Sequence, residues 1–380
     1  MRFARGLARI IFSLTFIVSG ILKLIDPLGT GLIVEEYFSF MHLGFLSPAS
    51  TVLGIALATI EFTIGITILI GLQMRFFIGL GLTFTALFTL LTLYLAIFNP
   101  ISDCGCFGRA IHLTNWQSFL KNVVLLLLAL LIFFGRFKAT VLASPALQWV
   151  FVGLFVSVAI WVGTDALINN PRIDFTAFSV GTDLGEDSSE EPLFETTFTY
   201  EKEGVRQHFT LDNLPDSTWT FVETTTRELA SSDRYARTDF APDSLQGSFF
   251  AVSVYDPEDL SPKQWLLLRQ FRDKAFQYGT AAAIYTPEGG SDLKQADRKA
   301  LLTLNRSNGG VTYFQDGVIT RKWARRNIGD INFEELLSMD AEDEIILRKS
   351  SDRIFIFSLL CIILLVLALI RLVCRIFISK

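Results

Sequence analysis

The chain has 380 residues, of which 51% are hydrophobic and 35 are phenylalanine. A soluble protein of this length is usually less apolar, and its hydrophobic residues are spread along the sequence. Here they are concentrated in long runs, so the composition excludes an ordinary soluble globular protein. Residues 170–350 carry 20 Lys and Arg against 31 Asp and Glu, whereas the rest of the chain carries 13 against 7. The net charge of −5 therefore combines a basic membrane part with an acidic soluble part.

Six apolar runs are each about 20 residues long, which is the length that a helix needs to cross a bilayer. They cover residues 7–25, 49–72, 76–98, 119–135, 147–168 and 354–370. The first run is too long for the apolar region of a signal peptide, and "SGILKLIDP" offers no small-x-small cleavage site. We therefore expect six transmembrane helices, the first of them retained.

The positive charges predict the orientation of these helices, because loops rich in Lys and Arg stay in the cytoplasm. The N-terminus and every second connection are basic, whereas the loop 26–48 contains neither Lys nor Arg. The basic positions are Arg2, Arg5, Arg9, Arg75, Arg136, Lys138, Arg371, Arg375 and Lys380. We expect a protein of the bacterial cytoplasmic (inner) membrane, with both termini in the cytoplasm and residues 170–350 outside it.

Glu61 lies near the middle of the second predicted span. A carboxyl group is costly at that depth and is by default a functional candidate. Lys23, near the outer end of the first span, can reach inward to pair with it or extend outward. Two roles for Glu61 stay open: a group that holds the helices together, and a proton acceptor coupled to thiol oxidation.

Two of the four cysteines lie in one short loop, "FNPISDCGCFGRAIH", between the third and fourth spans. Gly105 separates Cys104 from Cys106 and permits the bend that a bridge between them requires. Exchange chemistry needs an exposed thiolate and a second sulfur that resolves the mixed disulfide, and this loop offers both. Two other interpretations are a structural disulfide and a metal site. The metal site is the weaker one, because two cysteines do not supply the four ligands that zinc requires.

The soluble part begins with alternating apolar and polar residues around Glu203-Gly204, which predicts a hairpin. From residue 247 the pattern changes to strand, helix, strand, helix and a hairpin that turns at Asp316-Gly317. A last helix is expected at 330–338. This order predicts a mixed α/β domain.

The order of elements over roughly residues 247–338 resembles a thioredoxin-like fold. That fold carries a cysteine pair after its first strand and a proline before its hairpin. This chain has "YDPEDLSPKQ" at the first place, Gly309-Gly310 at the second, and no cysteine between residues 107 and 360. The resemblance therefore implies a redox-inactive domain that docks a partner protein.

The predicted fold is a multi-pass α-helical membrane protein with an extracytoplasmic α/β domain. Its segments are a four-helix bundle (1–138), a fifth transmembrane helix (139–169), an acidic linker (170–192) whose stretch "GTDLGEDSSEEP" is expected to be flexible, a β-hairpin region (193–246), the cysteine-free α/β domain (247–350) and a C-terminal transmembrane helix (351–380).

Three stretches, "SGILKLIDP", "ATIEFTIGITILIGL" and "DCGCFG", together resemble the DoxX/MauE group of membrane proteins over about residues 1–138. The resemblance implies a four-helix bundle related in architecture to vitamin K epoxide reductase, and a role in maturing disulfide-rich envelope proteins. By position, Cys104 and Cys106 take the redox role, while Gly105, Phe107 and Gly108 shape the loop. The soluble insert and the two further spans depart from this family, so its substrate is not carried over.

The leading hypothesis is a thiol–disulfide oxidoreductase or accessory factor that acts on an extracytoplasmic protein partner, with a membrane quinone as a candidate electron acceptor. The competing hypothesis is a non-catalytic envelope scaffold with a structural Cys104–Cys106 bridge. Transport through the bundle is disfavoured, because few polar residues besides Glu61 lie within the spans. The sequence contains no motif for binding a metal, a phosphate group or nucleic acid.

Overall fold

A computed structural model describes residues 2–101, 104–111, 113–135, 144–184, 194–202, 205–210, 219–228, 247–347, 349–354 and 357–358. Within these residues, five helices are long and apolar enough to cross a membrane. They are α1 (Arg2–Ile25), α3 (Ser50–Ile70), α4 (Met74–Phe98), α5 (Asn115–Phe133) and α6 (Pro145–Asn169). Five of the six predicted spans are thus confirmed as helices. The sixth, 354–370, lies almost entirely outside the described residues.

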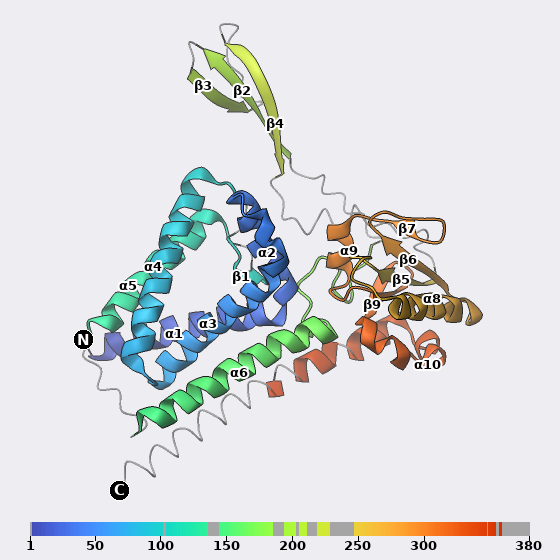
Figure 1. The fold of residues 1–380 in the computed structure, drawn as a ribbon, viewed down its shortest axis with the longest axis horizontal. Helices are drawn as coiled ribbons and strands as arrows, with labels where there is room; N and C mark the ends of the chain where they lie inside the picture. Colours follow the sequence, from blue (N-terminus) through green and yellow to red (C-terminus); the bar gives the residue numbers. More distant parts are fainter. Residues whose placement is uncertain are drawn as a thin grey trace.

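The bundle is held together by an aromatic and aliphatic core between α1, α3, α4 and α5 (Figure 1). Phe12 and Phe16 of α1 stack at 4.5 Å between ring centroids, and both are buried. Glycines let α1 and α3 approach closely. A methyl group on Gly20 would lie 2.7 Å from the Phe62 backbone nitrogen, and one on Gly65 would lie 2.8 Å from the Ser13 carbonyl oxygen. Small residues are a common means of bringing membrane helices into contact.

Helix α2 (Pro27–Phe40) and the 3-10 helix η1 (Gly44–Ala49) occupy the segment 26–48. The prediction of a simple loop there is wrong. Asp26 caps α2 by accepting a hydrogen bond from the Gly29 backbone nitrogen at 2.9 Å, and Pro27 takes the first helical position. Both are ordinary helix-start signals, so the Asp-Pro pair was the readable sign of this helix.

The α/β domain is built on a five-stranded sheet in the order β7-β6-β5-β8-β9. Its strands are β5 (Ser248–Ser253), β6 (Ala281–Thr286), β7 (Lys294–Gln295), β8 (Gly310–Gln315) and β9 (Val318–Trp323). Its helices are α8 (Pro262–Gln277), α9 (Arg298–Leu304), the 3-10 helix η3 (Arg325–Asp330) and α10 (Phe333–Ser338). Strand β5 is parallel to β6 and antiparallel to β8, as the predicted order of elements requires.

Alternating residues of β5 supply two cores, one on each face of the sheet. Phe250 packs with α8 and α10 on one face, and Phe249 packs with α9 on the other. The predicted turn between β8 and β9 is confirmed. Asp316 and Gly317 both have positive φ values, 48° and 83°, as a two-residue type I′ hairpin requires.

Residues 170–184 of the predicted acidic linker form a strap along the α/β domain, so residues 181–184 are held in place and not flexible as predicted. Phe178 is fully buried in the core beside α9. The Gly181 nitrogen donates to the Ile319 carbonyl at 2.7 Å, and the Ile319 nitrogen donates to the Thr182 carbonyl at 2.9 Å. The strap thereby satisfies backbone groups at the otherwise open edge of β9. Residues 185–193 of the predicted linker lie outside the described residues.

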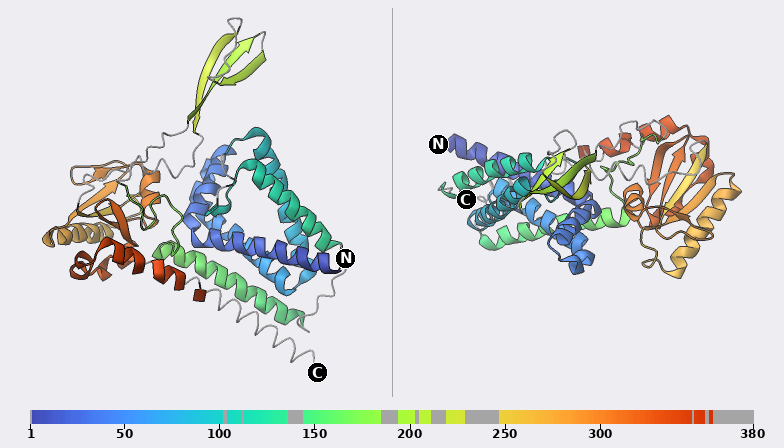
Figure 2. Two further views of the ribbon diagram at one scale, coloured as in Figure 1. Left: turned by 180° about the vertical axis from the view of Figure 1, so that it is seen from behind. Right: turned by 90° about the horizontal axis from the view of Figure 1, so that it is seen from above.

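A separate three-stranded antiparallel sheet has the order β3-β2-β4. Its strands are β2 (Phe194–Lys202), β3 (Val205–Thr210) and β4 (Thr220–Glu228). Lys202 pairs with Val205, which agrees with the predicted hairpin at residues 203–204. The views in Figures 1 and 2 show this sheet away from both the bundle and the α/β domain.

The α/β domain meets the bundle at the end where α1 finishes and α6 leads into the strap (Figures 1 and 2). An ion pair of 2.8 Å joins Arg306 to Asp26, and Asn170 donates to the Asn305 side-chain oxygen at 2.9 Å. We call this the domain end of the bundle. Residues 341–347 and 349–354 are helical and continue from the domain toward the predicted last span.

Candidate functional site

The cysteine loop lies at the domain end of the bundle, between α4 and α5. Its short strand β1 (Cys106–Arg109) packs against α1 and α2. Asn115 holds the start of the loop by donating to the Ile101 carbonyl at 2.7 Å. Tyr37 of α2 donates to the Cys104 carbonyl at 3.2 Å. The loop is therefore fixed from both sides.

Both cysteines are buried, with Cys104 6% and Cys106 8% exposed. The expectation of exposed sulfurs is therefore wrong. The sulfurs are buried because α2 packs over the loop and shields it from solvent. A partner thiol reaches the sulfurs only if this cover moves.

The two glycines of the loop have backbone conformations that side chains disfavour. Gly105 has φ 63° and Gly108 has φ 60°, and the Gly108 nitrogen donates to the Gly105 carbonyl at 3.0 Å. A methyl group on Gly105 would lie 2.5 Å from Ile33 Cγ2, whereas Gly108 has more room. Gly105 is thus required both by its φ value and by the close approach of α2. The Phe107 ring lies beneath the Lys121 ammonium, 4.6 Å from it.

Lys23 and Glu61 form a buried ion pair beneath the loop. Lys23 Nζ lies 2.6 Å from Glu61 Oε1, and their side chains are 8% and 6% exposed. The sequence left open whether Lys23 reaches inward to Glu61 or extends outward. The structure shows that it reaches inward and pairs with Glu61. The Ser19 hydroxyl lies 2.7 Å from Glu61 Oε2 and 2.6 Å from the Cys106 carbonyl oxygen, so it links this pair to the cysteine loop.

Two parts of the sequence match known family models. Residues 1–135 match the model of the methylamine utilisation protein MauE. This part of the chain is MauE-like. Residues 194–229 match a domain of unknown function (DUF8463). No curated protein and no solved structure matches the chain.

The MauE-like part ends three residues before the predicted boundary at 138, so it comprises α1 to α5 and the whole cysteine loop. The strap, the α/β domain and the small sheet lie beyond it. Their contribution must therefore be derived from their own contacts.

A cavity of about 40 Å³ lies inside the MauE-like bundle, lined by Cys106, Lys23, Glu61, Lys121 and Ser19 among others. One water molecule needs about 10–15 Å³, so two or three fit beside these polar groups. For comparison, an engineered cavity that binds benzene has a volume of about 150 Å³. The cavity does not fit a quinone ring in this conformation, and we derive no step through a quinone.

The two thiols differ in their acidity. Both cysteines are free, and Cys104 donates a hydrogen bond to the Cys106 sulfur. This hydrogen bond, aided by the Lys121 and Lys23 ammonium groups, lowers the pKa of Cys106 to about 6, although burial acts in the opposite direction. The same hydrogen bond and burial raise the pKa of Cys104. Cys106 is thus the thiolate of the pair.

We predict that this acidity is measurable as a pH profile. Alkylation requires the thiolate, so the rate at Cys106 should rise with pH around 6 and then level off, instead of rising around its ordinary pKa of 9.0. The measurement is the iodoacetamide rate between pH 4.5 and 9.5 on the reduced full-length protein, read by mass spectrometry. Lys121→Met should move the profile to higher pH. A profile centred near 9 in the parent would contradict the assignment.

Sequence reasoning missed several residues of this site, Lys121 above all. Lys121 lies in the fourth predicted span, seven residues into α5, where a charged side chain is as unusual as Glu61 is in the second. That position was a readable signal. Ser19 and Tyr37 gave none, because their importance arises only from the contact with the loop.

Proposed function

We propose that this MauE-like membrane protein carries out thiol–disulfide exchange with an extracytoplasmic protein through Cys104 and Cys106. The observation that carries the proposal is the hydrogen-bonded thiol pair, with the Lys121 ammonium beside Cys106. A merely structural site has no need for a cation at one sulfur. The match of residues 1–135 to the methylamine utilisation protein MauE agrees with an accessory role in the membrane.

The exchange needs no further oxidant or reductant. The Cys106 thiolate attacks one sulfur of a partner disulfide, which forms a mixed disulfide and releases the other partner sulfur as a thiolate. Cys104 then attacks the Cys106 sulfur, forms the Cys104–Cys106 bond and releases the second partner thiolate. The Cys104 proton and one from water neutralise the two partner thiolates. Two electrons pass from the dithiol to the partner disulfide, and the reverse sequence oxidises a partner dithiol.

Glu61 is the proposed proton acceptor of the site, with Lys23 as its partner. Its carboxylate and Cys106 line the same cavity, which has room for water between them. In that arrangement the Cys104 proton passes inward through water to Glu61 when Cys104 attacks, and Glu61 then returns it through water toward the partner thiolates.

We further propose that the cysteine loop and the α/β domain face the outside of the bacterial cytoplasmic membrane, with both termini in the cytoplasm. The distribution of Lys and Arg supports this orientation. The loop and the domain lie at one end of the bundle, as the Asp26–Arg306 ion pair requires. The sheet order β7-β6-β5-β8-β9 supports a thioredoxin-like domain, and that domain is proposed to dock the partner.

Thiol trapping in intact cells tests the proposal. The protein would carry Cys361→Ser and Cys374→Ser, and a membrane-impermeant maleimide would be added after graded reductant. We expect labelling of Cys104 and Cys106 to appear at a mild reducing potential. A bridge that yields only after denaturation would favour the envelope scaffold with a structural disulfide. Labelling in broken cells alone would contradict the orientation.

A further inference from the structure

Asp26 lies where three parts of the protein meet. Its Oδ1 caps α2, and its Oδ2 accepts a hydrogen bond from Arg306 Nη2 at 2.8 Å. Arg109, at the end of the cysteine loop, lies against the same corner, because its Cδ would be 3.1 Å from a methyl group on Gly29. One carboxylate thus connects the start of α2 with the α/β domain, and the end of the cysteine loop lies against the same turn of α2.

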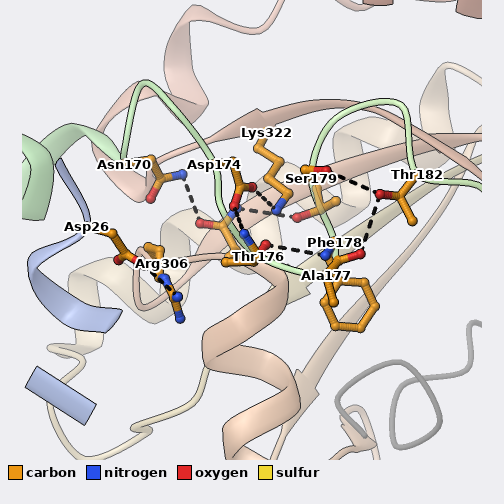
Figure 3. Close-up of polar contacts among 12 residues, drawn as sticks. Asp26, Asn170, Asp174, Thr176, Ala177, Phe178, Ser179, Thr182, Arg306 and Lys322 are labelled. Carbon is orange, nitrogen blue, oxygen red and sulfur yellow. Dashed lines mark hydrogen bonds and ion pairs between the residues drawn. The ribbon is translucent and has the colours of Figure 1, made fainter. Parts of the chain in front are cut away.

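The Asp26–Arg306 pair is shielded from solvent. The side chain of Arg306 is 3% exposed and that of Asp26 is 4% exposed. Figure 3 shows Arg306 of the α/β domain beside Asp26 of the bundle, with Asn170 close by. A buried pair resists salt and is costly to break from one side, because the remaining charge then stays buried without its counter-charge.

Arg306 is itself held in place within the α/β domain. Its Nη1 donates to the Leu302 carbonyl of α9 at 3.2 Å, and its carbonyl accepts from the Tyr255 hydroxyl at 3.2 Å. Asn308, two residues on, is bound to the Asp256 backbone at both its side-chain nitrogen and its oxygen. The arginine therefore extends from a rigid loop, and the position of the domain decides where its guanidinium lies.

From Asp26, α2 leads directly to the covered sulfurs. Ile33 lies about two turns of helix after the cap and packs on Gly105. Tyr37 follows one turn later, and its hydroxyl donates to the Cys104 carbonyl. Both contacts shift if the first turn of α2 moves. The cover over the thiol pair is therefore fixed at its base by a residue of another domain.

We propose that Arg306 is a positioning residue for the Cys104–Cys106 pair, and that it acts through Asp26 to hold α2 closed over the sulfurs. The α/β domain thereby controls access to the thiols, and a partner that displaces it from Asp26 opens the site. The chemistry that follows rests on the proposed exchange function. The control of access rests on the contacts alone.

The test measures the alkylation rate of the loop cysteines in the reduced full-length protein, with Cys361→Ser and Cys374→Ser as background. N-Ethylmaleimide is the probe, and mass spectrometry follows the peptide that contains residues 104–106. Arg306→Met should raise the rate about tenfold, because loss of a buried counter-charge favours local opening. Asp26→Asn keeps a good cap for α2 and should have the same effect.

Three comparisons make the result specific. The double variant should be no faster than either single variant, since both break one interaction. Arg306→Lys should return most of the parent behaviour. The matched control is Arg321→Met, which leaves the buried Glu344 of the same domain without its partner at 2.9 Å but does not touch Asp26, and should therefore change the rate less than about twofold.

The inference is overturned if Arg306→Met and Asp26→Asn behave like the Arg321→Met control, or if their effects multiply in the double variant. If Arg306→Met does not fold, Asp26→Asn decides alone. The two proposals can fail separately. If the alkylation rate depends on Arg306 but Cys104 and Cys106 exchange with no partner disulfide, the exchange function is contradicted and this inference stands. If the cysteines exchange but the alkylation rates of the variants are unchanged, this inference is contradicted and the exchange function stands.

Discussion

Cys104→Ser should accumulate the protein in a disulfide-linked complex with its partner, whereas Cys106→Ser should form no such complex. Cys106 is the thiolate, so its loss removes the attacking group, and a serine hydroxyl does not replace a thiolate in this reaction. Cys104 is the resolving group, so its loss leaves the mixed disulfide without the intramolecular step that releases it. Exchange should fall to background in both variants, for different reasons.

The measurement is non-reducing electrophoresis of membranes quenched with acid and maleimide, followed by mass spectrometry of any new band. The variant with Cys361→Ser and Cys374→Ser is the control and should exchange like the parent. Complexes that form through Cys104 in the Cys106→Ser variant would reverse the assigned roles. Exchange that survives in both variants would place the reactive sulfur elsewhere in the chain.

Replacing one partner of the buried Lys23–Glu61 pair should lower the stability of the protein much more than replacing both partners. Lys23→Met leaves the Glu61 carboxyl buried without its cation, and Glu61→Leu leaves the Lys23 ammonium without its anion. Each single variant should lose about 3–5 kcal/mol of stability. The double variant leaves no buried charge, so it should be more stable than either single variant. Exchange should nevertheless stay slow in the double variant, because it has no proton acceptor.

A double-mutant cycle on the detergent-solubilised protein measures this coupling by chemical or thermal unfolding. The matched control is Arg272→Met, since Arg272 pairs at 3.2 Å with Asp273, a side chain that is 61% exposed. Exposed pairs contribute less than about 1 kcal/mol. Additive losses at positions 23 and 61 would show that the pair does not stabilise the bundle as a unit.

The sequence predicted those features that depend on local pattern. The five described spans, the α/β order of elements and the turn at Asp316-Gly317 follow from apolar runs, capping residues and turn residues that lie close together in the chain. The cysteine loop was found in the same way, because a Cys-Gly-Cys sequence between two spans is unusual in itself. Glu61 was identified because its charge is out of place in an apolar run.

The remaining features arise from contacts that no local pattern encodes. The ion pair between Asp26 and Arg306 joins positions 280 residues apart. The burial of the thiols depends on α2. The first half of this helix is uncharged and contains no pattern that predicts a contact with the cysteine loop. The strap was predicted as a linker because its composition is polar, whereas the buried Phe178 and backbone hydrogen bonds to β9 hold it on the domain.

The strap also makes the α/β domain discontinuous in sequence. The Leu184 nitrogen donates to the Gly317 carbonyl at 3.0 Å, and the Gly247 nitrogen donates to the Asp316 side chain at 2.8 Å. Residues 185–246 therefore leave and re-enter the domain at a single β-turn. Because both ends of the segment are held at that turn, we expect sequence changes between residues 184 and 247 to leave the register of β9 and the position of Arg306 unchanged.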